Sequence, residues 1–182
     1  MSSKIQIFKN TMKGGGIRPN RFEVHLSPVG TPGLTELLML RVRSTNLPGF
    51  TQGTIPMSWR GRSTNFAGDK TFDPWTITVL DDVDFRLRNA FERWSEIINS
   101  FDNNTGTLNP ADYTTTAAVY QLDSQDRKVK GYELRGLWCS NVSPIDLSMD
   151  SGDTMSDFTV EFQIDDWVTT GVDGHNPSTL AL

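Results

Sequence analysis

The run NFAGDKTFDPWTITVLDD at residues 65–82, followed by FRLRNAFERWSEIIN at residues 85–99, decides the fold of this chain. In its first part Trp75, Ile77 and Val79 alternate with threonines, which is the period-two pattern of a strand with one buried face. In its second part apolar side chains recur every three or four residues, so one face of a helix is apolar. That face consists of Leu87, Phe91, Trp94, Ile98 and Phe101. The run therefore predicts a strand followed by one amphipathic helix.

Polar residues mark both ends of this helix. Asp81 or Asp82 is expected to cap its first turn, because a carboxylate there can accept a free backbone N–H. The run Asn-Asn-Thr-Gly at residues 103–106 is expected to end it.

Most of the remaining chain shows strand patterns. Residues 115–122 and 129–137 flank a polar connection, and residues 145–150 and 154–166 flank Ser-Gly-Asp, so two hairpins are predicted. Further strands are predicted upstream, at residues 21–26, 37–43 and 55–59. Antiparallel hairpins with one amphipathic helix predict a mostly β fold: a small antiparallel two-sheet barrel or sandwich with that helix on its flank.

The length of 182 residues fits one domain with arms. Residues 1–20 are interpreted as an N-terminal arm, since three glycines and a proline at residues 12–20 cannot sustain a helix or a strand. The β domain is expected over residues 21–167, and residues 168–182 are expected to form a C-terminal tail. Within the domain, the glycine-rich residues 44–70 predict a long, weakly structured excursion of the kind that binds a partner.

Charge is distributed unevenly along the chain, although the net charge is only −5. Residues 1–70 carry ten Lys/Arg and three Asp/Glu, whereas no Lys or Arg follows Arg135 and eight acids do. Such asymmetry fits a nucleic-acid patch with an acidic tail, or a subunit whose two ends attract each other in a head-to-tail assembly. It also fits two solvated surfaces without a partner.

No motif of the chain assembles catalytic chemistry. Gly14-Gly15-Gly16 lacks the Lys-Ser/Thr that follows in a phosphate-binding loop, and adjacent Asp165 and Asp166 point to opposite sides of a strand. The single cysteine, Cys139, is expected to be buried and inert. One cysteine and two histidines also leave few ligands for a structural zinc site. We therefore expect no enzyme, no cofactor and no metal. The apolar run 37–40 is too short to span a membrane.

Five segments in a fixed order resemble the tail tube protein of large contractile-tailed phages. They are residues 65–82, the helix that follows, RPNRFEVHL at 18–26, KGYELRGLWCSNVSPIDLSMDS at 130–151, and FTVEFQIDDW at 158–167. The resemblance covers most of the chain. It departs at residues 1–16 and after residue 167, and residues 31–40 match less well, so it implies the fold but not the contacts of the two arms.

The resemblance implies a structural protein of the virion, made in the host cytoplasm. It implies a tail-tube β-barrel domain at residues 21–167, six-subunit rings that stack into a tube, and a channel through which genomic double-stranded DNA passes. The same architecture is implied for type VI secretion and contractile bacteriocin tubes. The expected partners are copies of the chain itself, the tail sheath protein, and the tube-end proteins of the baseplate and neck.

Two groups of residues are the candidates for this assembly. Stacking of rings is expected to use the N-terminal arm, the assembly loop 44–70 and the C-terminal tail, with Arg18, Phe50, Trp59, Arg60, Arg62 and Lys70 as the candidate residues. The lumen is expected to be lined by acids of the last strand, Glu161 and Asp165, because DNA must slide without sticking. The alternative is that this polar strand face lies on the tube exterior.

Other functions stay open at this point. A tube-end protein of the same fold would have a different partner on one side, and a tube subunit of a bacterial contractile injection system would share nearly all features. A DNA-binding module could use Arg41, Arg43, Arg60 and Arg62 around Trp59.

Overall fold

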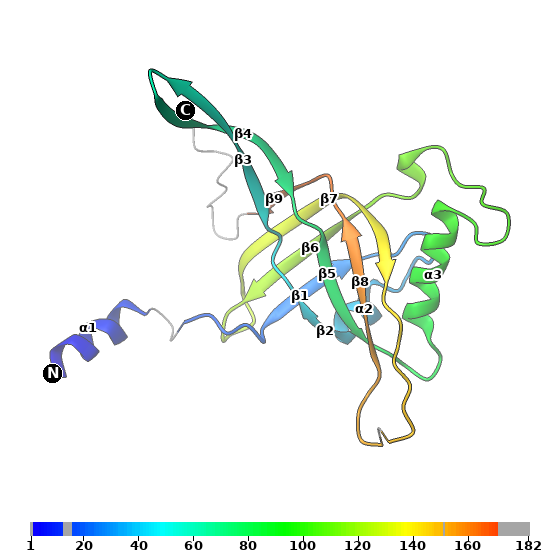
Figure 1. Ribbon diagram of the computed structural model, residues 1–182. Helices are drawn as coiled ribbons and strands as arrows, with labels where there is room; N and C mark the ends of the chain where they lie inside the picture. The colour runs from blue at the N-terminus through cyan, green and yellow to red at the C-terminus, as the bar shows by residue number, and fades with distance from the viewer. Residues whose placement is uncertain (1, 13–15, 151, 171–182) are drawn as a thin grey trace.

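The computed structural model describes residues 2–12, 16–150 and 152–170 (Figure 1). Nine strands, three α-helices and one 3-10 turn occur in these ranges. In chain order they are α1 (Ser2–Thr11), β1 (Phe22–Leu26), α2 (Thr35–Arg41), β2 (Val42–Thr45), β3 (Phe50–Trp59), β4 (Arg62–Phe72), β5 (Trp75–Leu80), α3 (Arg86–Ile98), η2 (Pro110–Asp112), β6 (Thr115–Leu122), β7 (Lys128–Val142), β8 (Asp157–Gln163) and β9 (Asp166–Thr170). Part of the predicted tail, residues 171–182, lies outside the described residues, as do Gly14 and Gly15.

The strands form one bent, antiparallel, seven-stranded sheet and a separate two-stranded hairpin, β3–β4. The sheet order is β1-β6-β7-β8-β5-β2, and β9 pairs with β7 as well. The long strand β7 serves two layers: its first part pairs with β6 and β9, and its last residues pair with β8. The expectation of a mostly β, antiparallel fold of two sheets is thus confirmed.

The bend in β7 lies at Gly136, whose φ of +63° is a conformation that favours glycine. Any Cβ at this position would overlap the side chain of Asp165, which lies in the short connection between β8 and β9. The backbone N–H of Asp165 donates to the carbonyl of Arg135 at 3.0 Å and so continues the pairing across the bend. The sheet therefore folds at Gly136 into two layers that share β7.

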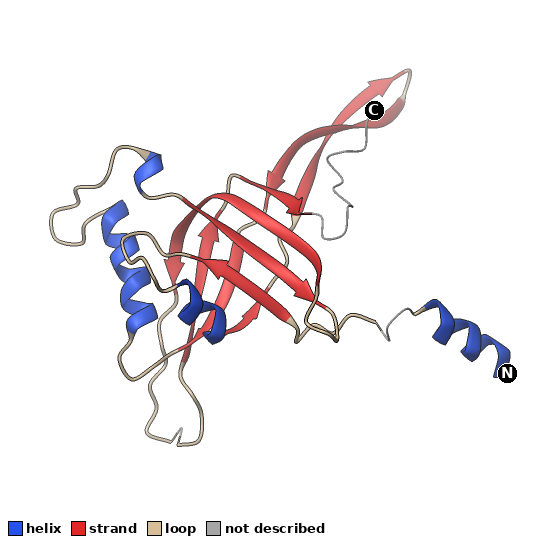
Figure 2. Ribbon diagram, turned by 180° about the vertical axis from the view of Figure 1, so that it is seen from behind, coloured by secondary structure: helices blue, strands red, loops and turns tan. Residues whose placement is uncertain are grey.

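The sheet does not close into a barrel among the described residues, because β1 and β2 end the strand order without pairing with each other. The helix α2 lies next to both edges, because it contacts β1 and leads directly into β2; it also contacts β5. Figure 2 shows α2 and the longer α3 on one side of the strands, while α1 and the β3–β4 hairpin extend away from the body.

The core lies between the two layers and under α3. Trp75 of β5 stacks on its cross-strand neighbour Phe162 of β8, with ring centroids 5.4 Å apart. From the helix, Phe91 and Trp94 approach the same Phe162 at 5.9 and 5.8 Å. The helix predicted from the apolar stripe is thus present, and its apolar face covers the core.

Two details of that helix differ from the prediction. The N-cap is Phe85, in the left-handed conformation and without a side-chain cap, because the helix begins only at Arg86. Asp82 lies too far upstream to cap it and accepts hydrogen bonds from the Val83 backbone N–H at 2.8 Å and from Arg41 at 2.6 Å. Phe101 is 70% exposed because the helix ends at Ile98, so the stripe is one residue shorter than its spacing suggested.

The prediction of a strand at residues 37–43 was wrong for residues 37–41, which belong to α2; only residues 42 and 43 lie in a strand, β2. Leu34, Leu37 and Leu38 are spaced for a helical face, and all three pack in or against the core. Glu36 in the first turn and Arg41 in the last complement the helix dipole. The expected single flanking helix is therefore one of three, since α1 also forms within the predicted N-terminal arm.

The second predicted hairpin was also wrong in its first strand. Residues 145–150 pair with no strand, and β8 begins only at Asp157. Proline at residue 144 and a run of serines and aspartates favour a loop here. By contrast, the hairpin of β6 and β7 is confirmed, and β7 extends five residues beyond the predicted end at 137.

Candidate assembly surface

Residues 44–70 were predicted as a weakly structured excursion, but most of them form the long β3–β4 hairpin. Register pairs run from Phe50↔Phe72 at the base to Trp59↔Arg62 at the free end. The two connecting residues, Arg60 and Gly61, have φ of +48° and +81°, which is the turn type that suits the twist of a hairpin. Because a two-residue turn fixes the register, this segment is a regular ribbon that projects from the body (Figure 1).

One face of the hairpin is apolar and exposed. Pairing places Ile55 opposite Phe66 and Met57 opposite Thr64, on the same face as Trp59, whereas the other face carries small or polar residues. The exposed fractions of Ile55, Met57, Trp59 and Phe66 are 54%, 58%, 71% and 53%. An isolated two-stranded ribbon is marginally stable, and an exposed apolar row on it is typical of a contact surface. We call these four residues the apolar face of the hairpin.

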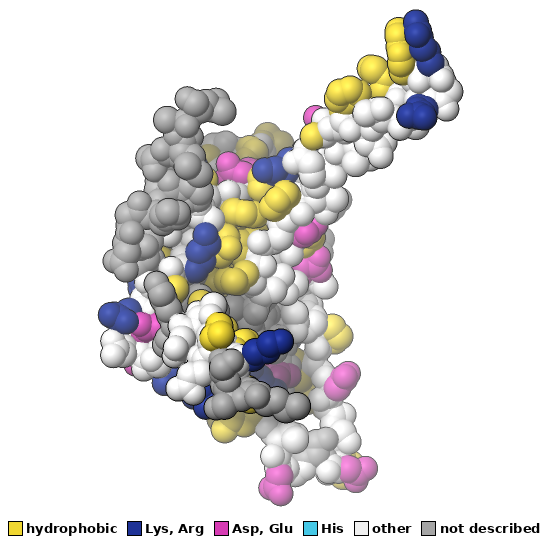
Figure 3. Space-filling model, turned by 90° about the vertical axis from the view of Figure 1, so that its left-hand side faces the viewer, with side chains coloured by type: hydrophobic (Ala, Val, Ile, Leu, Met, Phe, Trp, Pro, Cys, Tyr) yellow, Lys and Arg dark blue, Asp and Glu magenta, His cyan; other side chains and the backbone are white. Residues whose placement is uncertain are grey.

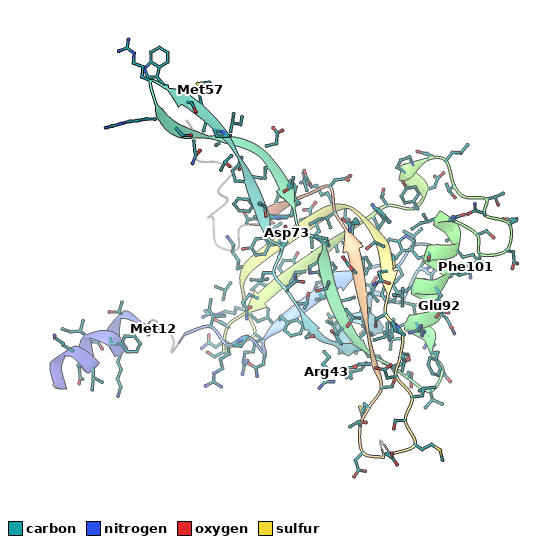
Figure 4. The ribbon with its side chains drawn as sticks, in the orientation of Figure 1. Met12, Arg43, Met57, Asp73, Glu92 and Phe101 are labelled. Atoms are coloured by element: carbon teal, nitrogen blue, oxygen red, sulfur yellow. The ribbon has the colours of Figure 1, made fainter. Side chains whose placement is uncertain are left out.

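The predicted stacking residues divide between the two ends of the hairpin. Trp59, Arg60 and Arg62 lie together at its tip, where the Arg60 guanidinium lies 5.4 Å from the Trp59 ring centre. Figure 4 labels Met57 near this free end and Asp73 at the base. The tip is the part of the hairpin farthest from the core.

Phe50 and Lys70 lie at the base instead. Phe50 and Phe72 each pack against Trp167 of β9 with centroids 6.0 Å apart, and the Lys70 ammonium lies 4.6 Å from the Phe50 ring centre. The Trp167 indole N–H donates to the carbonyl of Gly49 at 3.1 Å. These contacts fix the hairpin to the sheet.

Arg18 is not near the hairpin contacts. It precedes β1, and its backbone carbonyl accepts a hydrogen bond from the Gln121 side chain of β6 at 2.9 Å. Its exposed side chain has no ion pair among the described residues. The structure therefore does not bring the six predicted stacking residues into one patch.

The two predicted lumen residues lie in different surroundings. Glu161 is on the face of β8 away from the core, opposite Thr76 of β5, in a row with Thr159 and Gln163. Asp165 follows the end of β8, and it lies over Gly136 at the bend of the sheet. The strict alternation that linked the two acids ends at Gln163, so they do not share one regular strand face.

A second exposed surface lies in the connection between β7 and β8. Its described residues, 143–150 and 152–156, carry three aspartates and no Lys or Arg, and we call them the acidic loop. A groove of about 580 Å³ runs along the inside of the loop and is lined by its residues and by Arg43, Asp157 and Phe158. Arg43 pairs with Asp157 at 2.5 Å, so Asp146 is the aspartate of this groove without an ion pair among the described residues.

The sequence signals for these surfaces were incomplete. Ile55, Met57 and Trp59 alternate, which pointed to a short strand, but Phe66 joins them only through the register set by the turn. Leu147, Met149 and Met155 of the acidic loop are largely exposed. Their local sequence looks like that of buried residues in a strand, so their exposure could not be predicted from it.

Among the described residues, no three His, Cys, Asp or Glu side chains lie close enough to hold a metal ion. The thiol of Cys139 is buried, and burial raises its pKa to about 12, so it stays protonated at neutral pH. Among residues 2–12, 16–150 and 152–170, no helix has the length and apolar character needed to cross a bilayer.

Comparison with known proteins matches these features to one family. Residues 17–170 match the family model for the phage tail tube protein. The chain is 34% identical over 155 residues to the tail tube protein gp19 of Enterobacteria phage T4, covering 85% of this chain and 92% of that protein. It is 30% identical over 164 residues to the tail tube protein of Serratia phage KSP90, covering 87% and 93%.

The chain belongs to the phage tail tube protein family. This confirms the resemblance to tail tube proteins of contractile-tailed phages: the chain is a structural subunit of the tail tube, a component of the virion, and not an enzyme.

Solved structures share the fold at low identity. A chain of the baseplate of the anti-feeding prophage matches with a TM-score of 0.63 at 12% identity, covering 85% of this chain and 95% of that one. A chain of the sheath-tube complex of the PVC extracellular contractile injection system matches with a TM-score of 0.62 at 12% identity, covering 90% and 97%.

Proposed function

We propose that this chain forms six-subunit rings that stack head to tail into a tube, and that the channel of the tube conducts genomic DNA during ejection. The observation that carries the proposal is the projecting hairpin with its exposed apolar face. A surface of this kind, placed at one end of a subunit, fits a contact with a different surface of the next copy. Repeated contacts of that kind continue into a filament.

Unpaired sheet edges support the closed ring. Among the described residues, β1 and β2 each pair on one side only, and β9 pairs only with β7. Such edges invite pairing with another chain, and pairing between neighbours in a closed ring leaves none exposed.

The wall of the channel is proposed to carry Glu161 and Asp165. Neither Glu161 nor Asp165 takes part in an ion pair among the described residues, so both keep their negative charge. A ring repeats each charge six times around a narrow, low-dielectric wall, which focuses the field and keeps phosphates from adhering.

The tube exterior and its ends are proposed to bind other tail proteins, namely the sheath, and the tube-end proteins of the baseplate and neck. Support comes from the fold neighbours, one of which belongs to a sheath-tube complex and another to a baseplate.

The hairpin test removes its outer part and keeps its base. Residues 55–66 are replaced by Asn-Gly, so that the pair Thr54↔Ala67 is closed by a two-residue turn. Because these residues contribute nothing to the core, we expect a folded protein with an unchanged thermal midpoint that forms rings but no tubes, scored by circular dichroism and negative-stain electron microscopy.

Point variants supply the matched control. Met57→Ser with Trp59→Ser changes the apolar face, whereas Ser58→Ala with Ser63→Ala changes the opposite face of the same hairpin. The first pair should abolish tubes and the second should leave their length unchanged. Tubes of normal length from the shortened hairpin would refute the proposal, and wild-type protein that yields only single rings would indicate a tube-end protein instead.

A further inference from the structure

The two exposed surfaces lie at opposite ends of the molecule. The β3–β4 hairpin extends from one end of the sheet, and the acidic loop extends from the other (Figure 1). Figure 3 shows basic side chains beside apolar ones at the free end of the hairpin, and acidic side chains at the opposite end. Each copy thus presents two different surfaces that point in opposite directions.

The charges of these surfaces are complementary. The tip carries Arg60 and Arg62, and the acidic loop carries Asp146, Asp150 and Asp153. None of these five takes part in an ion pair among the described residues, while eight other pairs form elsewhere in them. Two tips would repel each other, as would two loops, so the charges favour tip against loop.

Both surfaces also expose apolar side chains beside the charges. In the acidic loop Leu147 is 91% exposed, Met155 is 79% exposed and Met149 is fully exposed. At the tip Trp59 is the most exposed side chain of the apolar face. Methionine adapts its shape to a partner, and Trp and Arg are the residues that most often anchor an interface.

The acidic loop is held in place where it leaves β7, at its first residue, Ser143. Ser143 donates its backbone N–H to the carbonyl of Thr159 at 2.8 Å, and its hydroxyl accepts from the Thr159 N–H at 2.8 Å. Arg88 of α3 donates to the carbonyl of Ser143 at 3.1 Å. These bonds position the groove between loop and β8 before any partner arrives, which lowers the entropy cost of binding.

We propose that the hairpin tip of each copy docks on the acidic loop of a second copy of this chain in the next ring, with Trp59 against Leu147, Met149 and Met155, and Arg60 and Arg62 against the aspartates. This inference rests on the proposed stacking of rings and identifies the surface that receives the hairpin. Since tip and loop lie at opposite ends, every ring offers six tips on one side and six loops on the other. The tube is therefore polar.

A charge exchange between two variants tests the pairing. The tip variant carries Arg60→Asp with Arg62→Glu; aspartate is used at residue 60 because it tolerates positive φ. The loop variant carries Asp146→Lys with Asp150→Lys. Alone, each variant sets like charges against each other at every joint, and we expect the concentration needed for half-maximal tube formation to rise at least about tenfold.

Mixing purified rings of the two variants in equal amounts gives the decisive result. An acidic tip then meets a basic loop, and a basic tip meets an acidic loop, so alternating rings satisfy every joint. Tubes should return at a concentration within about threefold of wild type. The matched control, Asp84→Lys with Asp102→Lys, makes the same charge change at two exposed acids outside both surfaces and should stack like wild type.

Two outcomes would overturn the inference: a loop variant that forms tubes like the control, or a mixture that stacks no better than either variant alone. A loop variant that forms normal tubes but no longer binds sheath would assign the acidic loop to the sheath, which also overturns it. Wild-type protein that never forms tubes would instead refute the proposed function, so the two failures are distinguishable.

Discussion

Truncation of Trp94 to alanine is expected to be among the most destabilising changes in the chain. The Trp94 side chain is fully buried, lies 6.5 Å from Phe91 and 5.8 Å from Phe162 between ring centres, and donates its indole N–H to the Tyr113 carbonyl at 2.7 Å. Loss of a buried Trp costs about 3–5 kcal/mol. The Tyr113 carbonyl also loses its donor, which adds about 1 kcal/mol. We therefore expect the free energy of unfolding to fall by about 4–6 kcal/mol.

The assay is urea unfolding followed by circular dichroism, at a protein concentration below that of assembly. Trp94→Phe keeps an aromatic ring but not the indole N–H, so its loss should be intermediate. Phe101→Ala is the control: the sequence placed Phe101 in the same stripe, but its exposure predicts a change within about 0.5 kcal/mol. A loss below about 1 kcal/mol for Trp94→Ala, or equal losses at both positions, would refute the assignment of the core.

Three further predictions concern the bend, an ion pair and the channel. Gly136→Ala should lower the free energy of unfolding by at least about 1–3 kcal/mol, because φ is +63° and the new Cβ meets Asp165; a midpoint equal to wild type in urea would contradict this. The hydrogen bond from Arg41 lowers the pKa of Asp82, so this pair stabilises the fold at neutral pH and its contribution is lost as the pH falls below about 4. Asp82→Asn should be less stable at neutral pH and show a flatter pH profile in acid, and parallel profiles would exclude the effect. Glu161→Lys with Asp165→Lys should still assemble yet slow DNA ejection at low salt, with the delay shrinking as salt rises; normal ejection with failed sheath assembly would place these acids on the outer wall.

Much of the fold was predictable because local patterns and tertiary packing agree. Trp75, Ile77 and Val79 alternate in the sequence and are buried in β5. The apolar stripe of α3 faces the core, where its Phe91 and Trp94 contact aromatic rings of β8. Residues 37–43 failed because a short apolar run fits a strand and a buried helix equally well. Whether this segment forms a strand or a helix depends on the space between the edge strands β1 and β2. That space is a property of the tertiary fold and cannot be read from the sequence of the segment.

The candidate surface was predictable only where it is local. Trp59, Arg60 and Arg62 are neighbours across one turn, so sequence reasoning placed them together. Phe50 and Lys70 were assigned to the same surface, although their position at the base depends on Trp167, about a hundred residues away in the sequence. The acidic loop lies opposite the hairpin only because the β7–β8 connection emerges from the other end of the sheet (Figure 1).

Cryo-electron microscopy of tubes assembled from the purified protein tests the central claim most directly. The account predicts a hollow tube of stacked six-subunit rings in which each β3–β4 hairpin reaches into the adjacent ring, with its tip on the acidic loop of a copy there. A tube in which the hairpins lie within their own ring or on the outer surface, or a protein that stays monomeric at high concentration, would contradict it.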